Sequence, residues 1–418
     1  MANLPSEFVQ QTRLLMGDER FGHYLQSFED EPPVSIRLNP LKTEGLTVAQ
    51  GEPVPWCQGG YYLSQRPNFT MDPLLHAGCY YVQEAASMFL DEVLRQMHNA
   101  YISHLPSAIR PLTALDLCAA PGGKSTLLRA VLPRDCVLYS NEPVRQRFSI
   151  LLENITKWGS PNHLVTNCYP TAFRRSKFTF DLILCDVPCS GEGMFRKDAA
   201  TISEWSPQQV EKCWQLQRDI VSDAWACLNP GGLLIYSTCT FNIKENEENI
   251  RWILENFEAE VVPIDIRPEW HITGSLLPDF HEPVYRFIPG ISRGEGLFMC
   301  VLRKRGEERR LSDKKRKPAS TDMLHVITPA SLSEGPQVTL PFSQAIAYLR
   351  GEALMLPPDT PRGMVRVCFE GHPLGLVKNI GSRANNQYPK EWRIKTTHIP
   401  EEYTPILVDS AELTVHSS

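Results

Sequence analysis

The sequence predicts an α/β protein built around a doubly wound, mainly parallel sheet, with an α+β region before it and a small, mostly β unit after it. Three observations lead to this prediction. Apolar strand-like runs alternate with helix-like stretches between residues 113 and 238, as in doubly wound sheets. A turn rich in Gly, Ala and Pro follows the first of these runs. After residue 304 the composition changes to a basic run and then to short segments punctuated by Gly and Pro.

Length and composition describe an ordinary globular protein. The 418 residues are enough for two or three domains, and 42% hydrophobic with 22% charged residues argues against wholesale disorder. The first twenty residues lack the basic and then apolar layout of a secretory signal, so we expect a cytoplasmic protein with no membrane contact. None of the 12 cysteines has zinc-ligand spacing, so no metal is expected.

Residues 1–100 are assigned to an N-terminal accessory region that recognises RNA. Residues 4–30 have the pattern of one or two short helices, and residues 35–42 alternate as an extended segment. Apolar residues recur at helical spacing over residues 81–97, which predicts a helix that leads into the next unit.

Residues 101–304 form the predicted catalytic domain. The strand-like runs cover residues 113–119, 136–142, 163–167, 180–186 and 231–238, and the helix-like stretches cover residues 127–132, 145–158 and 208–228. Two further strands at residues 284–290 and 297–304 close the unit. Ligands of such sheets bind beyond the carboxyl ends of the strands, so the functional residues are sought there.

Residues 305–321 are predicted to be a basic linker, and residues 322–418 a C-terminal unit of short strands and turns. The run over residues 303–317 carries nine basic and three acidic residues and has no apolar periodicity. It is either a solvated linker or a strap that contacts phosphates, and one segment can serve both purposes. The net charge of −6 argues against binding nucleic acid through bulk electrostatics.

The turn at residues 115–125 is a candidate cofactor loop. A phosphate-binding loop of the Gly-x-x-x-x-Gly-Lys-Ser type would need glycine at position 118, where this chain has Cys118. The small residues of the turn instead leave room for an adenosyl group and a methionine tail. Glu142, at the end of the second strand, stands where doubly wound folds accept hydrogen bonds from ribose hydroxyls.

Two cysteines follow neighbouring strands of the predicted sheet. Asp186 ends the strand at residues 180–186 and is followed by Cys189 in a Pro-Cys-Ser-Gly turn, while Cys239 directly follows the strand at residues 231–238. Either cysteine alone would be read as inert packing. Together with a carboxylate they suit methylation of cytosine C5, because C5 becomes nucleophilic only after a thiolate has added to C6. Asp186 can then bind the cytosine edge.

These residues resemble the Sun/Nop-type RNA cytosine-5 methyltransferases across residues 115–125, 186–193, 236–240 and 242–247, and at residues 37–39 and 81–88. The resemblance implies a Rossmann-like methyltransferase domain, S-adenosyl-L-methionine as cofactor and a PUA-like, RNA-binding C-terminal domain. It also implies that Cys239 is the nucleophile and that Cys189 assists product release. DNA cytosine-5 methyltransferases use the cysteine after proline, so Pro188-Cys189 alone would have suggested the opposite roles. The implied cofactor contacts are Cys118, Ala119, Ala120, Pro121, Gly122, Gly123, Lys124, Glu142 and Asp186, with Lys124 also orienting the site.

One position departs from the family pattern. Tyr169 stands where relatives place an aspartate beside the adenine. Asn167 or a backbone amide is the expected substitute for that contact.

The substrate is expected to be RNA, with small-subunit ribosomal RNA or the small ribosomal subunit favoured by the resemblance of the tail. Transfer RNA is an alternative, and so is a weak or inactive RNA-binding or ribosome-assembly factor on this fold. We expect a monomer. The side chains expected to contact RNA are Arg37, Arg196, Lys197, Lys378, Arg383 and Arg393.

Overall fold

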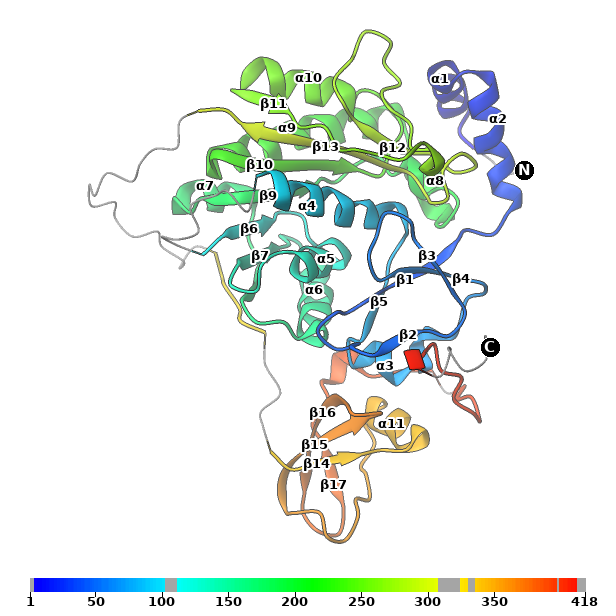
Figure 1. Cartoon of the computed structure of the whole chain (residues 1–418), viewed down its shortest axis with the longest axis vertical. Coiled ribbons are helices and arrows are strands. Elements are labelled where there is room, and N and C mark those ends of the chain that lie inside the picture. The colour runs from blue at the N-terminus through cyan, green and yellow to red at the C-terminus, as the bar shows by residue number, and fades with distance from the viewer. Residues whose placement is uncertain (1–3, 102–110, 307–323, 330–334, 397, 412–418) are drawn as a thin grey trace, which may run out of the picture.

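The computed structural model describes residues 4–101, 111–306, 324–329, 335–396 and 398–411. Most of the predicted basic linker therefore lies outside the described residues. In Figure 1 the large catalytic sheet occupies the upper part of the molecule, the N-terminal sheet lies beside it, and the small C-terminal domain lies below. Among the described helices, none is long and apolar enough to cross a membrane.

The catalytic domain contains an eight-stranded sheet with the order β11-β13-β10-β9-β6-β7-β8, and β12 pairs with β13. The strands from β10 to β8 run parallel, and β13 is antiparallel to β10. Their bounds are β6 Thr113–Asp116, β7 Val137–Asn141, β8 His163–Thr166, β9 Phe180–Asp186, β10 Leu228–Thr238, β11 Ala259–Val261, β12 Tyr285–Phe287 and β13 Leu297–Lys304. The predicted doubly wound sheet is confirmed.

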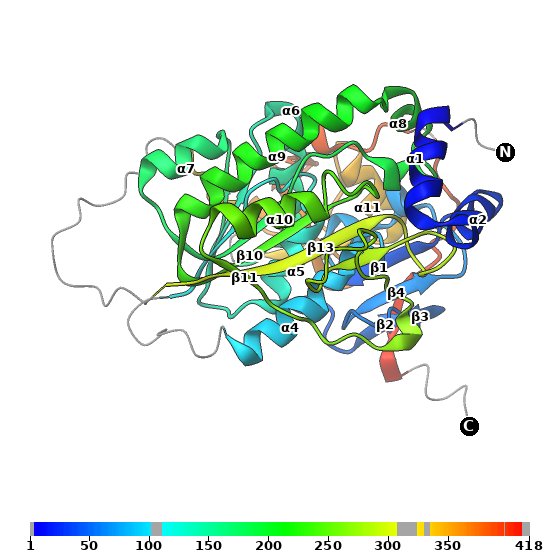
Figure 2. The ribbon, with the colours of Figure 1, turned by 90° about the horizontal axis from the view of Figure 1, so that it is seen from above.

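Helices cover both faces of this sheet, as Figure 2 shows from above. In β9, Leu182 and Leu184 face a core shared with α4 (Phe89–Ala100) and α5 (Gly123–Val131). The alternate residues Ile183 and Cys185 face the core that contains α9 (Pro207–Cys227) and α10 (Glu247–Asn256). Because both faces of β9 are buried, successive residues are apolar, and the strand is a continuous apolar run in the sequence. The remaining helices of the domain are α6 Arg145–Trp158, α7 Pro170–Ser176 and α8 Ala199–Glu204.

The N-terminal domain is a four-stranded sheet with the order β3-β4-β1-β5, preceded by two helices. Its elements are α1 Ser6–Met16, α2 Asp18–Gln26, β1 Val34–Leu38, β2 Leu46–Val48, β3 Gly51–Pro53, β4 Gly60–Leu63, α3 Pro73–His76 and β5 Tyr80–Val82. The helix predicted over residues 81–97 begins only at Phe89, because Tyr81 and Val82 pair with β1. The helix α1 packs on the catalytic domain, where the Phe8 ring lies 4.9 Å from that of Phe195.

The C-terminal domain combines the sheet β14-β15-β16-β17 with one helix that the sequence reading missed. Its bounds are β14 Gln337–Thr339, α11 Phe342–Leu349, β15 Gly363–Phe369, β16 His372–Asn379 and β17 Ala384–Asn386. Leu349 and Ile346 of α11 belong to the same buried cluster as Leu74 and Tyr80 of the N-terminal domain. The two terminal domains therefore share one core.

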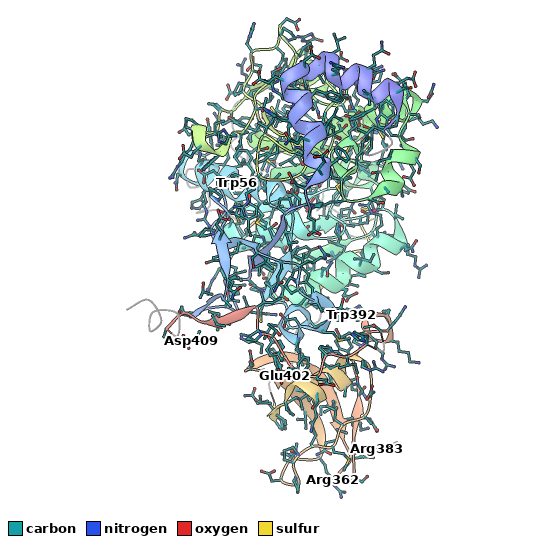
Figure 3. The ribbon with its side chains drawn as sticks, turned by 90° about the vertical axis from the view of Figure 1, so that its right-hand side faces the viewer. Trp56, Arg362, Arg383, Trp392, Glu402 and Asp409 are labelled. Atoms are coloured by element: carbon teal, nitrogen blue, oxygen red, sulfur yellow. The ribbon has the colours of Figure 1, made fainter. Side chains whose placement is uncertain are left out.

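Both ends of the predicted C-terminal unit, residues 322–418, contact other parts of the molecule. Ile327 bridges to Val165 at the edge of the catalytic sheet, and Leu324 is buried in the catalytic core. At the other end, β18 (Leu407–Asp409) leaves the C-terminal domain and pairs antiparallel with β2. We call this contact between the N-terminal and C-terminal domains the seam. Figure 3 shows Asp409 and Glu402 at the seam, close to the N-terminal sheet.

Candidate active site

The two predicted catalytic cysteines meet at the carboxyl edge of the catalytic sheet. Strands β9 and β10 run parallel with Asp186 beside Ser237, so the turns that follow them lie together. The sulfur atoms of Cys189 and Cys239 are 3.1 Å apart, and the Cys239 amide donates to the Cys189 sulfur. The hydrogen bond with Cys239, together with burial, raises the pKa of the Cys189 thiol well above its ordinary value. The two thiols therefore lie within hydrogen-bond distance of each other, and either sulfur can be the donor.

Asp186 and Lys124 form an ion pair in this edge of the sheet. The Lys124 ammonium donates to Asp186 Oδ2 at 2.8 Å, and the Ser237 hydroxyl donates to Asp186 Oδ1 at 2.6 Å. The Asp186 side chain is 31% exposed, so it is open to a ligand. Burial lowers the pKa of Lys124, but the nearby acidic groups, with the charge and hydrogen bond of Asp186 first among them, together raise it above its ordinary value.

The Glu245 side chain links the two turns that carry Cys189 and Cys239. Its buried carboxylate accepts hydrogen bonds from the Ser190 amide and hydroxyl, from Gln217 Nε2 and from Asn242 Nδ2. The Ser190 hydroxyl also contacts the Thr240 hydroxyl at 2.9 Å. Burial raises the pKa of Glu245 to about 7. The turn after β9 and the turn after β10 are thus joined through one carboxylate.

Glu192 makes a second link between the same two turns. It accepts from the amides of Phe241 and Asn242 and from the Trp205 indole. The adjacent Gly193 amide donates to the Cys239 carbonyl at 2.8 Å. A Cβ added at Gly193 would lie 2.6 Å from the Cα of Gly296, so only glycine permits this approach.

The predicted cofactor loop joins β6 to α5. Gly122 has a φ of +115°, a conformation that favours glycine, and the Ala120–Pro121 peptide bond is cis. Asp116 is fully buried and accepts from the Ser125 hydroxyl at 2.6 Å, which pins the helix start to the strand end. Burial raises the pKa of Asp116 to about 7. Burial likewise raises the pKa of the Cys118 thiol well above its ordinary value, so Cys118 is a neutral lining group.

Glu142 lies where the ribose site was predicted, at the end of β7. Its side chain accepts from the Val144 amide and pairs with Arg147 at 3.4 Å. Asn167 Nδ2 donates to the carbonyls of Glu142 and Pro143, so this amide group fixes the turn that follows β7. Tyr169 is 71% exposed at the start of α7.

Two of the predicted RNA contacts are corrected by their burial. Arg37 is 2% exposed and donates to Gln83 and to Thr126, so it joins the N-terminal sheet to the cofactor helix. The Arg196 side chain is 6% exposed and pairs with Glu295 at 2.9 Å. Guanidinium groups engaged inside the protein are not available to phosphates.

The remaining predicted RNA contacts lie nearer the surface. Lys197, Lys378 and Arg383 are exposed, and Arg393 is half-buried beside Gly351. Figure 3 shows Arg383 and Arg362 at the far end of the C-terminal domain.

Sequence reasoning missed the residues that support the cysteines, namely Glu245, Glu192, Gln217 and Ser237. The run over residues 242–247 carried a signal, because it is one of the segments that resemble the family, but nothing in the sequence showed that Glu245 points toward Ser190. Among the described residues, no group of three or more His, Cys, Asp or Glu side chains could hold a metal ion.

Comparison with known families accounts for most of the chain. Residues 110–303 match the family of 16S rRNA methyltransferase RsmB/F, and residues 4–85 match the N-terminal domain of 16S rRNA methyltransferase RsmF. Residues 336–394 match the methyltransferase RsmF PUA domain. The predicted Rossmann-like catalytic domain and PUA-like C-terminal domain are confirmed.

Curated relatives carry the name ribosomal RNA small subunit methyltransferase F. The protein from Pectobacterium atrosepticum is 34% identical over 73% of this chain and 63% of its own length. The protein from Shewanella amazonensis is 31% identical over 81% of this chain and 73% of its own length. The alignments with the relatives from the two Pectobacterium species thus reach less than two thirds of those proteins.

Solved structures agree with these matches. The crystal structure of PH0851 superposes with a TM-score of 0.60 at 26% identity, covering 72% of this chain and 66% of that one. A methyltransferase homolog protein from Pyrococcus horikoshii superposes with a TM-score of 0.55 at 25% identity, covering 72% of this chain and all of that one. The chain therefore belongs to the RsmB/F family of 16S rRNA methyltransferases.

Proposed function

We propose that the protein methylates cytosine C5 in small-subunit ribosomal RNA, with S-adenosyl-L-methionine as methyl donor, through a covalent bond between Cys239 and C6 of the base. The observation that carries this proposal is the thiol pair 3.1 Å apart, beside the Lys124–Asp186 ion pair. Methylation at nitrogen or oxygen needs no covalent adduct and would leave two paired thiols without a purpose.

The residues of the β6–α5 turn fit the proposed cofactor. Glu142 presents a carboxylate at the end of β7, where ribose hydroxyls can donate to it once the 3.4 Å contact with Arg147 gives way. Backbone amides at the start of α5 suit the carboxylate of the methionine tail. When bound, S-adenosyl-L-methionine supplies an electrophilic methyl group on a sulfonium.

Cys239 carries the first chemical step. Its thiolate adds to C6, the sulfur–carbon bond forms, and the electron pair of the C5–C6 double bond becomes available at C5. The Lys124 ammonium interacts electrostatically with Cys239. Asp186, which is open to solvent on one side, can bind the amino and protonated ring nitrogen of the cytosine.

Cys189 completes the cycle. After C5 has taken the methyl group, the C5 proton leaves to solvent, and the electron pair of the C5–H bond restores the C5–C6 double bond. The sulfur–C6 bond breaks, and its electron pair stays on the departing Cys239 sulfur. Cys189 lies within hydrogen-bond distance of the departing sulfur and can return a proton to it. This role assigns the second thiol to release and the first to attack.

The substrate class rests on the relatives' names and on the C-terminal domain. We infer that exposed basic side chains such as Lys378 and Arg383 bind RNA phosphates, with the protein acting as a monomer in the cytoplasm. Transfer RNA is the alternative substrate. An inactive RNA-binding factor is the second candidate, favoured only by Tyr169, which leaves the adenine without the family's carboxylate.

A methyl-transfer assay tests the proposal. The wild type is incubated with methyl-labelled cofactor and, separately, with small ribosomal subunits, naked small-subunit RNA and transfer RNA, and the nucleosides are identified by mass spectrometry. We expect 5-methylcytidine in small-subunit RNA and a loss of at least about 10,000-fold in Cys239→Ala.

The matched control is Cys213→Ala, which removes a buried cysteine from the neighbouring helix α9 and should keep the activity. Labelled transfer RNA alone would move the proposal to the alternative substrate. No transfer by a folded wild type that binds RNA would favour the inactive factor.

A further inference from the structure

The N-terminal sheet binds the first turn of α5 directly, and Figure 1 shows this helix beside that sheet. Arg37 of β1 donates through Nη2 to the Gly123 carbonyl at 3.3 Å and to the Thr126 hydroxyl at 2.6 Å. Its Nε donates to Gln83 Oε1 at 2.8 Å, just after β5, which fixes the orientation of the guanidinium. One side chain of the N-terminal domain thus holds both ends of the first turn of α5.

The two residues between these contacts bind the catalytic sheet instead. Lys124 donates to Asp186 at 2.8 Å, and Ser125 donates to Asp116 at 2.6 Å. The first turn of α5 is therefore fixed from two sides, by the N-terminal sheet and by the ends of β9 and β6. Its backbone amides are the ones that suit the methionine carboxylate of the cofactor, so these contacts decide where the amides lie.

The strand β5 also contacts the cofactor loop. Asn154 of α6 donates to the Pro121 carbonyl at 2.8 Å and to the Tyr81 hydroxyl at 3.4 Å. A Cβ added at Gly123 would lie 3.3 Å from the Tyr81 ring, so the loop packs closely on this strand. The N-terminal sheet therefore supports the loop at Pro121, Gly123 and Thr126.

Arg37 is a poor choice of side chain for stability alone. It is 2% exposed, and among the described residues it donates to neutral oxygens and lies 4.7 Å from the centre of the Trp158 ring. Its Nη1 atom is buried and has no hydrogen-bond partner in that part of the chain. A buried charge without an opposite charge costs free energy, and apolar residues of similar volume often replace buried charges without loss of stability. The guanidinium is therefore better explained by the turn that it positions.

We propose that Arg37 is a positioning residue for the cofactor: it fixes the first turn of α5 from the N-terminal sheet, so that this turn can bind the methionine tail of S-adenosyl-L-methionine. The inference rests on the proposed place of that tail at the start of α5. It gives the N-terminal domain a part in cofactor binding. The adenosine end of the cofactor is proposed to lie beside Glu142, away from Arg37, and should not depend on it.

The test is equilibrium binding of two ligands to the full-length protein without RNA, measured by isothermal titration calorimetry. S-adenosyl-L-homocysteine has both the nucleoside and the amino-acid tail, whereas 5′-methylthioadenosine lacks the tail. Arg37→Met keeps an unbranched side chain and removes the hydrogen bonds to α5. It should weaken binding of S-adenosyl-L-homocysteine by at least about tenfold, and binding of 5′-methylthioadenosine by less than about twofold.

Thr126→Val keeps the test decisive if Arg37→Met does not fold. It preserves the shape of the side chain, removes the hydroxyl that accepts from Arg37, and should weaken S-adenosyl-L-homocysteine alone by about two- to fivefold. Leu74→Ala is the matched control, because Leu74 is a buried residue of the N-terminal domain that belongs to the apolar cluster at the seam. It should lower the thermal stability and leave both affinities within about twofold of the wild type.

Equal weakening of both ligands in Arg37→Met would overturn the proposal, since a general loss of structure does not distinguish the tail from the nucleoside. Unchanged affinity for S-adenosyl-L-homocysteine in Arg37→Met or in Thr126→Val would overturn it too. So would an equal loss in Leu74→Ala, which would follow stability rather than position. The proposed methylation can fail in its own assay while the wild type binds S-adenosyl-L-homocysteine and this dependence on Arg37 is found, so the two failures are distinguishable.

Discussion

The cysteine edge of the catalytic sheet and the seam between the terminal domains are held together in different ways. At the cysteine edge, Lys124 pairs with Asp186, and Glu245 accepts hydrogen bonds from Ser190 and Gln217. At the seam, Leu349 and Leu407 belong to a broad apolar cluster. The cysteine edge depends on a few polar contacts, whereas the seam is stabilised by many apolar contacts. A single change should therefore have different consequences in the two regions.

The largest effect is expected for Glu247→Gln, directly behind the catalytic turn. Glu247 pairs with Arg286 through two hydrogen bonds of 2.7 and 2.8 Å, and both side chains are 0% exposed. Removing one charge leaves the other buried and unpaired, which should lower the free energy of unfolding by about 3–5 kcal/mol. Urea unfolding followed by tryptophan fluorescence measures it. A loss below about 1 kcal/mol would mean that this edge is not held by charge.

The next effect is expected at the seam. Leu349→Ala removes a fully buried side chain of α11 and should lower the free energy of unfolding by about 3 kcal/mol through the cavity it leaves. The alkylation rates of Cys189 and Cys239 should not change. Leu14→Ala, at a side chain that is 87% exposed, is the control and should have almost no effect. A change in cysteine reactivity would show that seam and site are coupled.

A smaller effect is the pH dependence contributed by Asp116 and Glu245. Burial raises both pKa values to about 7, from ordinary values of 3.8 and 4.5. Between about pH 4.5 and 7 the folded protein keeps these protons while the unfolded chain loses them, so stability falls as the pH rises and levels off above pH 7. Asp116→Asn should reduce this loss by an amount on the order of 2 kcal/mol in unfolding curves taken at pH 5 and pH 8. An unchanged pH dependence in Asp116→Asn would contradict the assignment.

The smallest effect is expected on the surface of the C-terminal domain. Replacing exposed Lys378 and Arg383 together by glutamine should weaken RNA binding by several-fold and reduce the slope of log affinity against log salt by roughly 1 to 2. Lys177→Gln, at an exposed lysine of the catalytic domain, is the control. Equal salt slopes for the wild type and the double variant would remove this surface from the RNA interface.

The same contrast explains what could be predicted from the sequence. The catalytic strands were located closely, because alternation of apolar runs is a local signal, and the β9 prediction matches its observed bounds. The convergence of Cys189 and Cys239 was also expected, since parallel strands end at the same edge of a sheet. Both inferences use short stretches of sequence.

The misses depend on contacts between distant parts of the chain. Pairing of β18 with β2 joins residues more than 350 positions apart, and no local sequence pattern predicts it. Arg37 and Arg196 were assigned to RNA by residue type, but buried partners engage both side chains. The role of Glu245 likewise depends on a turn that lies 55 positions earlier in the sequence.

The most direct measurement of the central claim is to trap the covalent intermediate. Cys189→Ala is expressed in cells, protein is separated on a denaturing gel, and any RNA in a slowly migrating band is sequenced. We predict a band in Cys189→Ala that contains small-subunit ribosomal RNA and that disappears in Cys189→Ala/Cys239→Ala. A band that persists without Cys239, or no band from a folded Cys189→Ala protein that still binds RNA, would contradict attack by Cys239 and release by Cys189.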